Sequence, residues 1–246
     1  MSQATMETPK HTDKKAKITQ ESFDETVTVK VGEERRVFLV HKNLLSNAAN
    51  YFKAAFNGNF AEAQSQVLEM PEDGPEQFRW FVRWLYTDRV LQEGETLSES
   101  QFSILIPLYT FGEGRGIPDL QNEVIDVLVE LEHSSKMIPT KLLNFVYEHT
   151  HRNSPLRRLF VDWLAYRATL DNGKWFAEEK ESRYPKRCLM DITVVLYKIK
   201  TQERPKTRDF IASRSDYYVQ SSESSATNSA GEENNIGGDL VASADT

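Results

Sequence analysis

Cysteine is almost absent from this chain of 246 residues, since Cys188 is the only one. A single cysteine excludes an intramolecular disulfide and is typical of proteins from a reducing compartment. No apolar run approaches the roughly 20 residues that span a bilayer, and residues 1–20 lack the apolar segment of a secretory signal. We therefore expect a protein of the cytoplasm, the nucleus or both that does not bind membranes.

The sequence also lacks an excess of positive charge. Its formal net charge is −7, and residues 221–246 contain five acidic residues and no Lys or Arg. The rest of the chain is therefore close to neutral. Nucleic-acid phosphates require a broad positive field, so we do not expect DNA or RNA as a partner.

Apolar residues are scarce at both ends of the chain, before Phe23 and after Phe210. Such segments cannot bury enough surface to offset the entropy lost on ordering. We expect a disordered arm over residues 1–22 and a disordered, acidic, Ser-rich tail over residues 211–246. The folded part then lies between them.

The folded part begins with a pattern that predicts a β-hairpin. Valines alternate with polar residues over residues 27–31, and a turn at residues 32–34 leads to a second apolar stretch at residues 37–40. From Lys42 to Phe56 the apolar spacing becomes that of a helix, which Gly58 should end.

A second strand-and-helix pair follows the first helix. Residues 66–70 predict a strand, and Pro75 suits the first position of the next helix. That helix is apolar over more than half its circumference, so it must be covered on two sides. We expect Phe81 and Trp84 to be core residues.

The remaining segments predict helices only. Residues 102–111 are almost wholly apolar, the Gly-rich residues 112–116 should break that helix, and residues 120–131 predict another. Residues 132–210 predict a helical extension. The predicted fold class is α/β (α+β): a small sheet flanked by helical hairpins, with an α-helical C-terminal extension.

Residues 23–131 contain a set of motif residues at characteristic spacing: Phe38, His41, Lys42, Tyr51, Phe52, Phe60, Glu62, Trp84, Leu85, Tyr86 and Thr87. With this set, residues 23–131 resemble the BTB/POZ domain. Residues 147–150 and 154–158 make the extension, residues 132–210, similar to the C-terminal segment of short BTB proteins of filamentous fungi. The family also has an acid at the start of the first strand that pairs with a base, which Asp24 or Glu25 with Lys42 would provide here.

The resemblance implies a module for protein–protein interaction. Many BTB domains form homodimers, and we expect a dimer interface at Tyr51, Phe52 and Phe56. A subset of the family resembles adaptors that join a substrate protein to a cullin ubiquitin ligase, and the matching cullin contact would be Phe60 with Glu62. The alternative for Phe60 is a core residue that seats the loop before the third strand.

Two other functions stay open on the sequence. One is a nuclear transcriptional cofactor or scaffold that uses the BTB dimer surface without a cullin, and the other is an enzyme with an unrecognised site. We expect no enzyme, because His41 and Cys188 lack the partners of a catalytic group. We expect neither cofactor nor metal, since His149 and His151 have no second ligand pair at zinc spacing.

Overall fold

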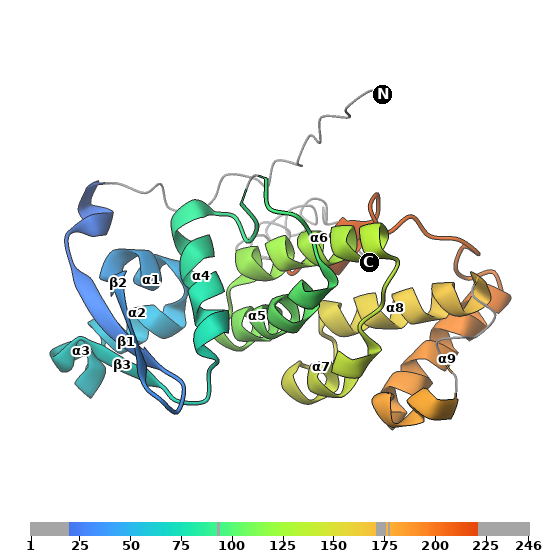
Figure 1. The fold of residues 1–246 in the computed structure, drawn as a ribbon, viewed down its shortest axis with the longest axis horizontal. Helices are drawn as coiled ribbons and strands as arrows, with labels where there is room; N and C mark the ends of the chain where they lie inside the picture. Colours follow the sequence, from blue (N-terminus) through green and yellow to red (C-terminus); the bar gives the residue numbers. More distant parts are fainter. Residues whose placement is uncertain (1–19, 93, 171–175, 177, 221–246) are drawn as a thin grey trace, which may run out of the picture.

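A small sheet lies at one end of the molecule and helices continue from it to the other end (Figure 1). The structure is a computed structural model that describes residues 20–92, 94–170, 176 and 178–220. The strands are β1 (Thr26–Val31), β2 (Arg36–His41) and β3 (Val67–Met70). The α-helices are α1 (Lys42–Ala48), α2 (Asn50–Asn57), α3 (Ala61–Ser65), α4 (Pro75–Thr87), α5 (Phe102–Arg115), α6 (Pro118–Ser135), α7 (Leu143–His149), α8 (Pro155–Leu170) and α9 (Lys186–Lys200). The 3-10 helices are η1 (Gln20–Phe23), η2 (Glu99–Gln101), η3 (Thr140–Leu142), η5 (Glu178–Arg183) and η6 (Arg214–Tyr217).

The three strands are ordered β2-β1-β3, with β1 antiparallel to β2 and parallel to β3. Val29 lies opposite Phe38 on one side and Leu68 on the other. Because side chains alternate along a strand, the valines of β1 all point into the core, where they are buried. The predicted hairpin and third strand are confirmed.

The helix expected from Lys42 to Phe56 is two helices. Ala49 has an extended backbone between α1 and α2, with φ of −156°. The apolar spacing continues across the break, so it could not show where the helix is interrupted. The expected end near Gly58 and the start at Pro75 are both confirmed.

Aromatic rings form the centre of the core. The Phe81 ring of α4 stacks on Phe52 at 5.6 Å between centroids and packs against Phe111 of α5 at 4.8 Å. Trp84 and Phe78 extend this cluster along α4. Phe81 and Trp84 are buried, which confirms their prediction as core residues.

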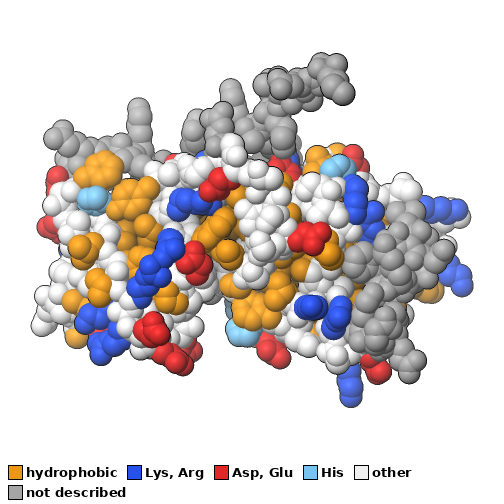
Figure 2. All heavy atoms as spheres, viewed as in Figure 1, with side chains coloured by type: hydrophobic (Ala, Val, Ile, Leu, Met, Phe, Trp, Pro, Cys, Tyr) orange, Lys and Arg blue, Asp and Glu red, His pale blue; other side chains and the backbone are white. Residues whose placement is uncertain are grey.

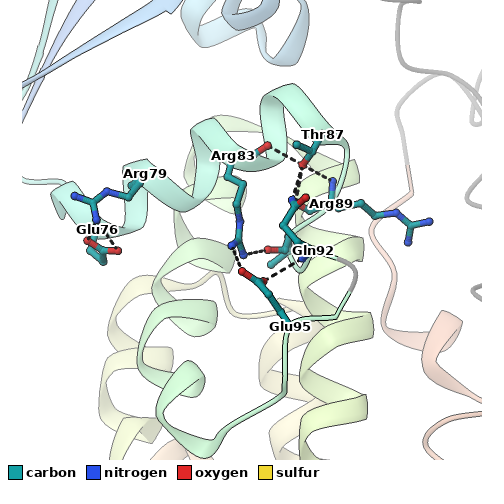
Figure 3. Close-up of polar contacts among 8 residues, drawn as sticks. Glu76, Arg79, Arg83, Thr87, Arg89, Gln92 and Glu95 are labelled. Atoms are coloured by element: carbon teal, nitrogen blue, oxygen red, sulfur yellow. Dashed lines mark hydrogen bonds and ion pairs between the residues drawn. The ribbon is translucent and has the colours of Figure 1, made fainter.

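Arg83 fixes the loop that follows α4, as Figure 3 shows. Its guanidinium lies 4.0 Å from the Trp80 ring, pairs with Glu95 at 2.7 Å and donates to the carbonyl of Val90. The backbone N–H of Gln92 donates to the Glu95 carboxylate and lowers its pKa, and the Arg83 guanidinium lowers that pKa further. The polar loop is therefore closed against α4 rather than extended into solvent.

The expected helix break at residues 112–116 is wrong. Helix α5 continues through Gly112 and Gly114 and ends at Gly116, whose φ of +64° favours glycine. A Cβ at Gly112 would lie 3.1 Å from the Gln121 side chain of α6. This glycine thus permits the close approach of α5 and α6, which the sequence pattern alone did not reveal.

The domain boundary expected at residue 131 falls inside α6, which continues to Ser135. Beyond it, α7, α8 and α9 confirm that the extension is helical. Cys188 is a buried free thiol of α9. Among the described residues, no helix combines the length and apolar character needed to cross a membrane.

Both expected terminal boundaries need correction. Residues 20–22 belong to a short 3-10 helix, and residues 211–220 dock on the protein rather than forming part of the tail. Tyr217 is buried and donates to Asp162 of α8 at 2.8 Å, while Val219 bonds with the Asn122 side chain of α6. The remainder of the expected arm and tail, residues 1–19 and 221–246, lies outside the described residues.

Candidate protein-interaction surface

Two aromatic side chains are exposed in the segment that contains α2 and α3, one in the first turn of α2 and one just before α3. Tyr51 of α2 is 42% exposed, and Phe60, the residue before α3, is 60% exposed. Glu62 follows in the first turn of α3 and is half-buried. We call Tyr51, Phe60 and Glu62 the α2–α3 surface.

The turn that presents Phe60 is fixed by the backbone. A Cβ at Gly58 would lie only 2.4 Å from the carbonyl oxygen of Ala54, so this position requires glycine. At the other end of α3, Gln66 adopts a left-handed conformation, and its backbone N–H donates to the backbone carbonyl oxygen of Glu62 at 2.8 Å. The Gln66 side chain also donates to the carbonyl of Ala63. The segment that carries Phe60 is therefore fixed on both sides, by the turn at Gly58 and by the hydrogen bonds of Gln66.

Tyr51 lies beside a charged pair. Its ring packs edge-on against Phe52 at 5.1 Å, and the guanidinium of Arg115 lies 5.3 Å from its centroid. Arg115 in turn pairs with Asp73 at 2.5 Å. Burial raises the pKa of the Asp73 carboxyl more than Arg115 lowers it. The guanidinium beside Tyr51 is therefore already paired with a carboxylate of the same chain.

The predicted dimer interface is wrong for two of its three residues. Phe52 and Phe56 are buried in the core of a single chain, where Phe52 stacks on Phe81. They cannot contact a second copy without unfolding the domain. Of the three, Tyr51 alone is exposed.

The other family-motif residues stabilise the fold around the hairpin. The His41 Nδ1 and Tyr86 hydroxyl lie 2.6 Å apart, and the Phe23 ring packs edge-on against His41. Lys42 pairs with Glu25 at 3.2 Å, so Glu25 is the acid expected to meet this base. Phe38 packs edge-on against Phe78. Trp84 and Leu85 are buried.

Sequence reasoning missed an exposed apolar pair on β2. Val37 and Leu39 are 60% and 70% exposed and point to the sheet face opposite the core. Figure 2 shows hydrophobic side chains at the sheet end of the molecule. The alternation around Phe38 and Val40 was a usable signal, because Val37 and Leu39 must face away from those two core-facing positions.

Comparison with known families agrees with this fold. The family model of the BTB/POZ domain matches residues 18–102, which include the hairpin, the α2–α3 surface and α4. Residues 18–102 are therefore identified as a BTB/POZ domain. No curated protein matches the chain. The BTB/POZ domain gives the protein a role in protein–protein interaction.

Proposed function

We propose that this protein is a substrate adaptor that presents Phe60 and Glu62 to a cullin-type scaffold of a ubiquitin ligase. The observation that carries the proposal is the exposure of Phe60, which is 60% open to solvent at the start of α3. A residue that seated the loop in the core would be buried, so the alternative expected for Phe60 loses its support.

The physical argument rests on an apolar ring held in place before binding. Burial of an exposed Phe side chain contributes about 1.5 to 3 kcal/mol. The closed turn between Gly58 and Gln66 limits the entropy lost when a partner covers the ring. Glu62 lies two residues after Phe60, in the first turn of α3, where its carboxylate would accept a hydrogen bond from the partner or pair with a cation of the partner.

Replacing Phe60 by Ala together with Glu62 by Lys should weaken cullin binding at least about thirtyfold, because an aromatic anchor contributes about 2 kcal/mol or more. Isothermal calorimetry with a panel of purified cullins measures the effect. Gln64→Ala is the matched control, since it truncates an exposed residue of α3 without removing the aromatic ring or the acid. Circular dichroism should show that both variants are folded.

Equal binding by wild type and the double variant would refute the adaptor proposal. Absence of binding by the wild type to every cullin of the panel would refute it as well. In either case the role in protein–protein interaction would stand without a cullin.

A homodimer is a second proposal, now placed on β2 rather than on the first helix. Strand β2 is an edge of the sheet, and Val37 and Leu39 are exposed on it. Exposed apolar edge strands favour association with another strand, and two-fold dimers use one surface twice. Two copies of β2 paired antiparallel would bring the two apolar pairs side by side on one sheet face, where cross-strand contacts would bury part of each.

Leu39→Glu should convert this dimer to a monomer, because two-fold pairing of β2 would replace an apolar cross-strand contact by two like-charged carboxylates near each other. Light scattering at tens of micromolar protein gives the mass of each variant. Thr96→Glu, which adds the same charge in an exposed loop, should leave the dimer intact. A monomeric wild type, or a Leu39→Glu variant that still dimerises, would contradict this proposal.

A further inference from the structure

Helix α9, in the extension beyond the BTB/POZ match, exposes an apolar surface. Four exposed apolar side chains lie on the outer side of this helix, and we call them the α9 face: Leu189, Met190, Val194 and Tyr197. Met190 and Tyr197 are 60% and 63% exposed. Met190, Val194 and Tyr197 follow the i, i+4, i+7 spacing of one helical row.

The opposite side of α9 fixes the helix on the protein. Cys188, Ile192, Val195 and Ile199 are buried there. The carboxylate of Asp191 accepts from Tyr147 of α7 at 3.1 Å and pairs with Arg187 at 2.9 Å. The α9 face is therefore held rigid, and it needs little reorganisation before a partner binds.

Positive charge lies around the α9 face. Lys186 precedes the apolar row, and Lys198 and Lys200 lie near its C-terminal end. None of these three lysines pairs with an acid within the part of the chain that the structure describes. Lys and Arg side chains also project from the α8–α9 end of the molecule in Figure 2. The partner that complements this surface carries negative charge beside its apolar side chains.

We propose that the α9 face docks an acidic amphipathic helix of another protein. Met190 to Tyr197 spans about 10 Å at a rise of 1.5 Å per residue, which matches two turns of a helix whose apolar residues also follow i, i+3 or i+4, and i+7. Acidic residues flanking that row would pair with Lys186, Lys198 and Lys200. This inference is independent of the cullin proposal.

Two other occupants fit less well. A second copy of α9 would bring Lys186, Lys198 and Lys200 of one chain close to the same lysines of the other, and these like charges would repel. An anionic membrane would require bulky apolar residues over a broad basic face. Here the exposed apolar residues of α9 are few and include neither Trp nor Phe.

The test is selection of peptides of about 20 residues from a displayed random library on the full chain, with no variant used during selection. We expect selected peptides rich in Asp and Glu with apolar residues at helical spacing. By fluorescence anisotropy, Val194→Glu and Lys186→Glu should each weaken binding about tenfold or more. Added salt should weaken it further. Thr96→Glu, in a loop outside the extension, should leave it unchanged.

Several results would overturn the proposal. They are the selection of no peptide, selected peptides without acidic residues, and binding that persists in Val194→Glu. Binding to vesicles of phosphatidylcholine and phosphatidylserine that Val194→Glu abolishes would assign the face to a membrane. A dimer that Val194→Glu dissociates would assign it to a second copy. Circular dichroism must show that the variants are folded.

Discussion

Phe81→Ala should lower the free energy of unfolding by about 3 to 5 kcal/mol, which approaches the whole stability of a small domain. The ring is fully buried and contacts Phe52, Phe111 and Trp84. Its removal leaves a cavity where α2, α4 and α5 meet, because neighbouring rings on three different helices cannot all move inward.

Chemical denaturation followed by circular dichroism measures this loss. Phe60→Ala is the control, because it removes the same ring from an exposed position and should change stability by less than about 0.5 kcal/mol. A Phe81→Ala variant as stable as the wild type would show that α4 does not lie at the centre of the core. A large loss in Phe60→Ala would show that its ring stabilises the fold.

Asp162→Ala should cost about 3 to 5 kcal/mol and release residues 204–220 from the protein. Asp162 is buried in α8, pairs with Arg204 at 2.6 Å and accepts from Tyr217 at 2.8 Å. Without its carboxylate, Arg204 loses its partner and the buried hydroxyl of Tyr217 loses its acceptor. Burial is the main cause that raises the pKa of the Tyr217 hydroxyl, and the negative charge of Asp162 raises it further. The hydroxyl therefore remains protonated and donates to Asp162 at neutral pH.

Amide hydrogen exchange should detect this release as lost protection over residues 204–220. Asp216→Ala is the matched control, since Asp216 pairs with Arg208 at an exposed position and should contribute less than about 1 kcal/mol. Unchanged protection in Asp162→Ala would mean that the C-terminal segment is held by contacts other than this carboxylate.

Local patterns in the sequence predicted the elements well, and they failed where the answer depended on distant contacts. The alternating valines of β1 and Pro75 at the start of α4 were correct because strand alternation and helix initiation are local. The spacing of Phe52 and Phe56 indicated an apolar face of a helix. It could not indicate that α4, more than 20 residues away, covers Phe52.

The docked C-terminal segment shows the same limit. Composition after Phe210 predicts disorder because it averages over many polar residues. A few specific contacts with distant residues dock this short segment, among them Tyr217 with Asp162 and Val219 with Asn122. The pairing of Glu25 with Lys42 was predicted, but from resemblance to a family in which this contact recurs.

The cullin contact at Phe60 and Glu62 was chosen from the family motif and stays a prediction. The structure adds that the Phe60 ring is exposed rather than part of the core. Val37, Leu39 and the α9 face were missed, because each apolar run was assigned to the core as a whole. Alternation along β2 was a usable signal for Val37 and Leu39, whereas packing decides which residues of α9 remain exposed.

The central proposal, that the BTB/POZ domain contacts a cullin through Phe60 and Glu62, is tested most directly by a hydrogen-exchange footprint. The full chain would be measured alone and with saturating cullin. We predict new protection confined to residues 50–65, with none on the β2 face or α9. Protection located elsewhere, or no change at saturation, would contradict the account.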